Sequence, residues 1–379
     1  MKKSILTSLV LLALLAACRD EGEIFIPEEV DVTAPDDTGL AGFYLLNEGN
    51  MGSNKSTLDY YDYGRGVYLR NIYADANPSV PKELGDVGND IRIYGGRLYA
   101  VINCSNKVEV MDAATARRLG QVDIPNCRYI RFDKGYAYVT SYAGPVELNP
   151  NYEQTGYVAK VDTATLLVVD RCPVGFQPDE LEVVDSKIYV ANSGGYMFPN
   201  YESTVSVIDI PSFTEIKRIE VARNLHRLRA DRHGNLWVTS RGDYYDQPSR
   251  LYRVDIRTDN LADSLDIAVS NFFLDGDSLY LYSVEWSYVT MSDVTTYAIV
   301  DVARREIVSR NFITDGTDQL IRKPYGVAVH PKTKDIYVTD AKNYVSPGTL
   351  YCFGQDGKLK WNVRTGDIPA HFAFRPHAP

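Results

Sequence analysis

The sequence predicts an all-β fold, a seven-bladed β-propeller with four antiparallel strands in each blade. A strand pattern with a central aromatic residue occurs seven times, as FYLLN, LYAVI, AYVTS, IYVAN, LWVTS, LYLYS and IYVTD. Each copy is followed by a second strand, and six of these second strands end in aspartate: Asp62, Asp112, Asp162, Asp209, Asp255 and Asp301. The aspartates recur at intervals of roughly 50 residues, the length of a four-stranded propeller repeat, and the repeat shows no helical periodicity.

The innermost strand of each blade lies ahead of the aromatic motif. In most copies it starts eight residues earlier, as at Ile91, Ile130, Leu181 and Phe272. The first copy has no such strand before it, but the C-terminal segment GDIPAHFAFRP resembles the missing one. We therefore expect a C-terminal strand to complete the first blade and close the ring, which removes the open edges of the sheet.

The N-terminus predicts export and lipid anchoring. Lys2 and Lys3 precede an apolar run, residues 5–16, that is too short to span a membrane. The run ends in LLAAC, which resembles the lipobox of bacterial lipoproteins and makes Cys18 the lipidated residue. The predicted organisation is a lipoprotein signal peptide at 1–17, an acidic tether at 18–40 and the propeller at 41–379.

Acidic residues directly after the cysteine, in RDEGE, resemble a surface-export signal of lipoproteins in some gut bacteria. This predicts a protein that is lipid-anchored to the outer membrane and faces the cell exterior. The net charge of −10, with no cluster of Lys and Arg, argues against a nucleic-acid partner.

One face of the predicted propeller carries long aromatic loops. The turns that join the first strand to the second, and the third to the fourth, are short. The loops between the second and third strands are long, and they hold an unusual share of the 28 tyrosines. Loops on a rigid scaffold commonly carry binding sites. The aromatic candidates for ligand contact are Tyr142, Tyr196, Phe198, Tyr201, Tyr244, Tyr245, Trp286, Tyr288 and Tyr344. The alternative is that these rings only pack against each other and order the loops.

Polar residues at the starts of the innermost strands should lie on the same face, near the central channel. They would form a polar floor beneath the aromatic rim, suited to a planar ligand with apolar faces and polar edges. The candidates are Arg128, Glu180, His226, Arg227 and His371.

The cysteines beyond Cys18 permit one disulfide. Cys104 ends a strand of the second blade and Cys127 opens a strand of the third, so adjacent blades could join them, and export permits the bond. Cys172 and Cys352 fall in strands of distant blades and are expected to be buried thiols.

Signatures of catalysis are missing from the sequence. It contains no HExxH, GxSxG or CxxC motif and no convergent carboxylates for a metal, so we expect neither an enzyme nor a metal site. A propeller lyase or lactonase that uses His226 and His371 is an open alternative.

The signal sequence, lipobox, tether and blades such as IYVAN…VSVIDI resemble the seven-bladed lipoproteins of the YncE-like, surface-layer-like group, over residues 41–379. The tyrosine-rich loops, short tether and length look most like the surface-exposed cobalamin-binding (BtuG-type) lipoproteins within that group. This resemblance implies a corrinoid as the bound ligand, not as a catalytic cofactor, and a TonB-dependent outer-membrane transporter as the partner. A carbohydrate- or protein-binding adhesion module would also use Tyr and Trp loops and stays open.

Overall fold

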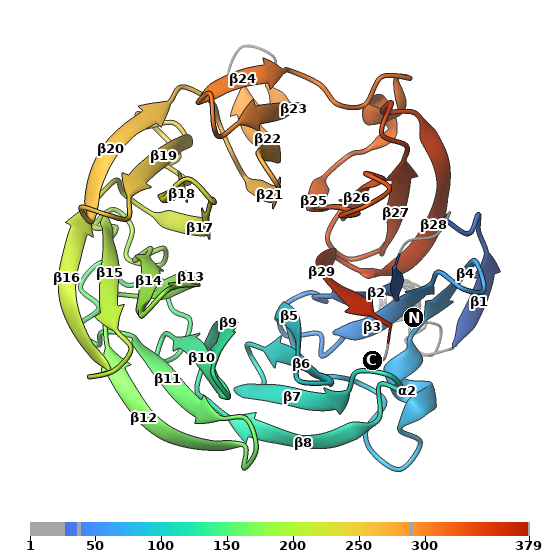
Figure 1. Cartoon of the computed structure of the whole chain (residues 1–379), viewed down its shortest axis with the longest axis horizontal. Coiled ribbons are helices and arrows are strands. Elements are labelled where there is room, and N and C mark those ends of the chain that lie inside the picture. Colours follow the sequence, from blue (N-terminus) through green and yellow to red (C-terminus); the bar gives the residue numbers. More distant parts are fainter. Residues whose placement is uncertain (1–26, 36–38, 288–290, 378–379) are drawn as a thin grey trace, which may run out of the picture.

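The structure is a ring of seven antiparallel sheets around a central axis (Figure 1). It is a computed structural model that describes residues 27–35, 39–287 and 291–377. The predicted seven-bladed β-propeller is confirmed. Cys18 and Tyr288 lie outside the described residues, as does the whole predicted signal peptide.

Six blades contain four strands each, and the chain passes through them in order around the ring. The second blade contains β5 (Gly88–Tyr94), β6 (Arg97–Ile102), β7 (Lys107–Asp112) and β8 (Arg118–Asp123). The third contains β9 (Cys127–Asp133), β10 (Tyr136–Ser141), β11 (Tyr157–Asp162) and β12 (Leu167–Pro173). The fourth contains β13 (Pro178–Val184), β14 (Lys187–Asn192), β15 (Thr204–Asp209) and β16 (Thr214–Glu220).

The remaining three of these six blades follow the same plan. The fifth contains β17 (Leu225–Ala230), β18 (Asn235–Ser240), β19 (Arg250–Asp255) and β20 (Asn260–Leu265). The sixth contains β21 (Asn271–Asp275), β22 (Ser278–Ser287), β23 (Ser292–Asp301) and β24 (Glu306–Ser309). The seventh contains β25 (Pro324–Val329), β26 (Ile336–Asp340), β27 (Pro347–Phe353) and β28 (Leu359–Asp367).

The first blade joins the two ends of the chain. Its strand order is β1-β4-β3-β2-β29, where β29 (Pro369–Pro376) pairs with β2 (Leu40–Asn47), and Tyr44 lies opposite Ala373. The predicted closure by a C-terminal strand is therefore confirmed.

The outer edge of this blade differs from the sequence-based prediction. Residues 28–31, which we assigned to the tether, form a fifth strand, β1 (Glu28–Asp31), on the outer side of β4 (Val67–Arg70). β3 (Thr57–Asp62) lies between β4 and β2. Most β1 side chains are exposed, so the strand is held by its backbone and leaves no hydrophobic pattern in the sequence.

The two repeated sequence features have separate structural roles. The motif aromatics fill the core between blades, and six of the seven are buried: Tyr44, Tyr99, Tyr138, Tyr189, Trp237 and Tyr337. The aspartates order the turns after the third strands. Asp112, for example, accepts hydrogen bonds from the backbone N–H groups of Ala114 and Thr115 at 3.0 and 2.9 Å. Short polar side chains favour such turns because they can bond to nearby backbone.

Within the described residues, two short helical segments interrupt the pattern. The helix α2 (Ile72–Ala76) connects the first two blades and buries Tyr73 in their shared core, and η2 (Thr317–Leu320) precedes the seventh blade. A search of the described residues finds no helix long and apolar enough to cross a membrane.

Residues 285–295 are expected from the sequence to form the long loop between the second and third strands of the sixth blade, but most of the described residues in this range are strand. β22 and β23 continue as a paired hairpin to Ser287 and Ser292, with Trp286 opposite Asp293. β22 and β23, of 10 residues each, are therefore longer than the corresponding strands of the other blades.

Candidate functional site

Exposed aromatic rings from two adjacent blades come together on the loop face. The ring of Phe198, in the β14–β15 loop, lies 5.7 Å from that of Tyr245, in the β18–β19 loop, and 6.0 Å from that of Tyr201. Tyr245 is 69% exposed and Tyr244 is 62% exposed. We call Phe198, the partly buried Tyr201, Tyr245 and its sequence neighbour Tyr244 the aromatic cluster. Rings of this size left in solvent on a rigid support are typical of a contact surface.

A tight turn presents the two tyrosines of the β18–β19 loop. The carboxylate of Asp243 accepts hydrogen bonds from the backbone N–H groups of Tyr245, Asp246 and Gln247 at 2.8–3.0 Å. The backbone of this loop is therefore fixed without help from the Tyr244 and Tyr245 side chains, which extend into solvent.

The other predicted aromatics have different surroundings. Tyr142 is buried, donates its hydroxyl to Asp179 Oδ1 at 2.8 Å, and lies beneath the Arg128 guanidinium. Its ring also meets that of the partly buried Tyr196, with the centroids 6.4 Å apart. For Tyr142, therefore, the alternative that the ring orders its loop describes the structure better.

Two predicted residues lie on other blades. Tyr344, 38% exposed in the β26–β27 loop, packs edge-on against Tyr325. Trp286 is 52% exposed near the end of β22, and no ring contact within the described part of the chain joins it to the aromatic cluster.

Below the loops, the predicted polar residues divide into an upper and a lower layer along the channel. In the upper layer the fully buried carboxylate of Asp179 forms ion pairs with Arg128 Nε at 3.3 Å and with Arg241 Nη1 at 3.1 Å. His226 Nε2 lies 3.1 Å from the Tyr129 hydroxyl. Burial lowers the pKa of His226 well below its usual value, and the nearby guanidiniums lower it further, so the imidazole is neutral at pH 7.

Glu180 is the centre of the lower layer. It is 1% exposed, and its Oε1 lies 2.6 Å from Arg229 Nη1 and 2.8 Å from Arg131 Nη2. Burial alone would raise the pKa of Glu180, but the surrounding guanidiniums outweigh burial and hold the pKa well below the usual value. Glu180 is therefore a structural anion in the channel wall.

His371 lies on another part of the wall. Its Nε2 is 2.8 Å from Glu48 Oε1, and Glu48 Oε2 accepts a hydrogen bond from the Tyr325 hydroxyl at 2.8 Å. His226 and His371, paired in the hydrolytic alternative, thus belong to separate hydrogen-bonded groups.

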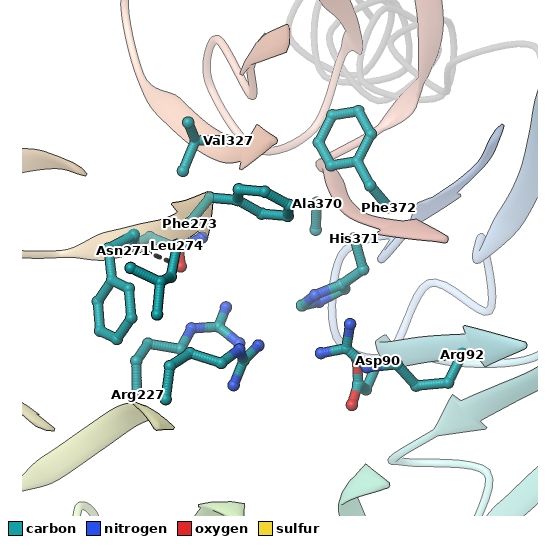
Figure 2. A pocket seen from close by; sticks show the side chains of 12 residues that line it. Asp90, Arg92, Arg227, Asn271, Phe273, Leu274, Val327, Ala370, His371 and Phe372 are labelled. Carbon is teal, nitrogen blue, oxygen red and sulfur yellow. Dashed lines mark hydrogen bonds and ion pairs between the residues drawn. The ribbon is translucent and has the colours of Figure 1, made fainter. Parts of the chain in front are cut away.

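A cavity opens in the lower layer, as Figure 2 shows, with Asp90, Arg92, Arg227 and His371 around a common space. Its volume is about 90 Å³. Drug-sized ligands occupy pockets of roughly 300–1,000 Å³. A large ring-shaped ligand would therefore lie above the channel, on the loops.

Sequence reasoning missed Arg92, Arg131, Arg229, Arg241 and Glu48. A usable signal was present for three of them, because the innermost strands read DIRI, RYIRF and HRLRA. Charged residues at alternating positions of an otherwise buried strand indicate a charged channel wall.

The predicted disulfide between Cys104 and Cys127 is absent from the structure, where both are free thiols. Cys127 Sγ lies 3.3 Å from the carbonyl oxygen of Lys107, whereas Cys104 Sγ lies against Asn103 Oδ1. Burial raises the pKa of Cys127 to about 12, so the thiolate needed to form the bond is scarce at neutral pH. Cys172 and Cys352 are buried thiols, as expected.

Among the described residues, no group of three or more His, Cys, Asp or Glu side chains is placed to hold a metal ion.

Residues 41–353, nearly the whole ring, match the family model of a domain of unknown function, DUF5074. The chain belongs to this family. A comparison with curated protein sequences gives no match. The family assignment and the propeller fold agree, but neither specifies a ligand for a DUF5074 chain.

Solved structures similar to this DUF5074 chain include two propeller-like proteins. One is a hydrazine synthase from Kuenenia stuttgartiensis, 15% identical with a TM-score of 0.61, covering 76% of this chain and 90% of that chain. Another is a quinonprotein alcohol dehydrogenase-like protein from Bacteroides thetaiotaomicron VPI-5482, 13% identical with a TM-score of 0.58. The match covers 89% of this chain and 79% of that chain. At these identities the likeness concerns the fold alone.

Proposed function

We propose that the protein is an outer-membrane surface lipoprotein that binds a corrinoid on its loop face and delivers it to a TonB-dependent transporter. The observation that carries the proposal is the exposed aromatic cluster, which joins loops of two neighbouring blades. A corrinoid has a broad apolar ring edged by amides, and exposed Phe and Tyr rings above polar groups suit both parts of it.

The geometry favours binding by the cluster itself. Tyr244 and Tyr245 project from a turn that Asp243 already orders, so their side chains are available for contact with a ligand. Anchoring through Cys18 would hold this face near the membrane surface, where a transporter could receive the ligand. Recovery of the full-length protein in the soluble fraction after cell lysis would contradict the anchored part of the proposal.

The test is calorimetric titration of the purified protein and its Tyr244→Ala/Tyr245→Ala double variant with cobalamin and cobinamide. We expect the double variant to bind at least about tenfold more weakly, as for loss of an interface hot spot. Its melting temperature should stay close to that of the wild type, because exposed loop rings contribute little to the core.

A matched control is Leu167→Ala/Val169→Ala, which removes two exposed apolar side chains from β12, on the outer edge of the third blade. This control should bind as tightly as the wild type. Equal loss in both double variants, or loss of affinity that follows a lowered melting temperature, would indicate that the rings only order the loops. Absence of corrinoid binding by the wild type would end the corrinoid proposal and favour a carbohydrate or protein ligand for the same face.

A further inference from the structure

The channel cavity is lined by an excess of cationic side chains. Three arginines, Arg92, Arg227 and Arg229, meet it together with His371, Phe273 and Phe372 (Figure 2). The arginines come from the innermost strands of the second and fifth blades. The ring therefore brings together charges that are far apart in the sequence.

These arginines belong to one network of ion pairs. It contains the guanidiniums of Arg92, Arg131, Arg227 and Arg229 and the carboxylates of Asp90, Glu180 and Glu182. Four positive groups thus meet three negative groups. Glu48, the carboxylate beside His371, is already bonded to His371 and to the Tyr325 hydroxyl and does not supply the missing negative charge.

Two members of the network account for the imbalance. Arg131 and Arg229 satisfy Glu180 at 2.8 and 2.6 Å, but Arg227 approaches it only to 3.8 Å and Arg92 only to 3.9 Å. Arg92 Nε also lies 3.4 Å from Asp90. The closest carboxylate bonds are therefore made by two arginines, while the other two remain loosely held.

Both loosely held arginines have an unused donor. The Nε atoms of Arg92 and Arg227 are buried and make no hydrogen bond to the described residues, although Arg92 Nε forms the 3.4 Å ion pair with Asp90. A buried donor without a partner costs free energy. Burial, reinforced by neighbouring Arg131, lowers the pKa of Arg92 to about 10, which still leaves the guanidinium charged at pH 7.

We propose that the channel cavity is a binding site for a small oxyanion, a phosphate or a carboxylate, held by Arg92 and Arg227. Such an anion would balance the fourth positive charge, and the planar guanidiniums that line the cavity match two oxygens of either group. The volume of about 90 Å³ admits an ion of this size and excludes a corrinoid. The site is therefore independent of the aromatic cluster.

The test titrates the purified protein with inorganic phosphate and, separately, with acetate, in a zwitterionic buffer free of chloride. We expect saturable binding by calorimetry and a rise in melting temperature with ligand concentration, because a ligand that binds only the folded state stabilises it. Tighter binding of phosphate or of acetate would identify which class the cavity prefers. The Arg92→Gln and Arg227→Gln variants should each bind at least about tenfold more weakly.

The control is Arg304→Gln, which removes an arginine that pairs with Asp301 on the outside of the sixth blade. It should keep the wild-type response to both anions. The wild-type titration alone is decisive if a channel variant fails to fold. No heat and no thermal shift with either anion would overturn the proposal, as would equal affinity in the channel variants and the wild type.

Discussion

At Glu180, a single carboxylate holds together side chains from three blades. Its oxygens contact arginines on β9 and β17 as well as the backbone N–H of Leu228. A buried charge of this kind is tolerated only because it is fully paired. The residue thus joins three neighbouring blades at the wall of the channel.

Replacing Glu180 by Gln should destabilise the fold strongly. The amide cannot neutralise the surrounding guanidiniums, and breaking a buried ion pair costs about 3–5 kcal/mol. Urea unfolding of Glu180→Gln should show this loss. The control is Glu29→Gln, whose partner Arg65 is exposed and 2.9 Å away, and it should change the free energy of unfolding by less than about 1 kcal/mol. Similar effects from the two variants would contradict this role for Glu180.

The neutral state of His226 makes stability depend on pH. Because burial lowers its pKa in the folded state, the unfolded chain takes up a proton that the folded protein does not as the pH falls below about 6.5. Stability should therefore be full above this pH and decline below it, with a slope of up to about 1.4 kcal/mol per pH unit from this residue.

Urea unfolding between pH 7.5 and 5.5 measures this dependence. Burial also lowers the pKa of His330, so the wild type should show contributions of the same sign from both residues. The His226→Gln variant should lose the contribution of His226, keep that of His330, and give a shallower slope. The same slope in the variant and the wild type would show that His226 does not cause the decline.

Among the elements, those with a strong side-chain pattern were predictable and those held by backbone were not. Seven copies of the aromatic strand predicted the blade count, and six of them bury the motif residue in the core between blades. β1 and the extension of β22 and β23 carry mostly exposed side chains. The sequence therefore has no alternation of apolar and polar residues there that would predict a strand. Which strands they pair with, β4 for β1 and each other for β22 and β23, is seen only in the structure.

The two terminal strands of the first blade should differ sharply in their contribution to stability. Deleting residues 367–379 removes β29, whose Ala370, His371 and Ala373 are buried, and leaves the ring open. We expect no soluble folded protein. Deleting residues 27–35 removes β1 from the outer edge and should leave a folded protein with a slightly lower melting temperature.

Circular dichroism with thermal unfolding compares the two deletions directly. They affect opposite edges of one sheet, so each is a control for the other. Unchanged unfolding after the loss of β29 would disprove the importance of closure, and complete unfolding after the loss of β1 would show that the outer strand is part of the essential core.

For the whole molecule, the loop-bearing face was predictable and the arrangement within it was only partly so. Loop length and tyrosine content identified the face, and the structure brings Phe198, Tyr201 and Tyr245 together there. Contacts such as Tyr142 with Asp179, or Glu180 with Arg229, join different blades. Their geometry depends on the position of each blade relative to its neighbour in the ring. No local pattern in the sequence predicts that position.

The pairing of β2 with β29 also sets an order of events during synthesis. β2 is made before the other six blades and must wait for its partner until all of them have left the ribosome. Contacts so distant in sequence form slowly, because a long segment has to be brought back on itself. During that interval the edge of β2 is open to wrong partners and to proteases. A nascent chain that stops early cannot complete its first blade, so closure of the ring distinguishes finished molecules from fragments.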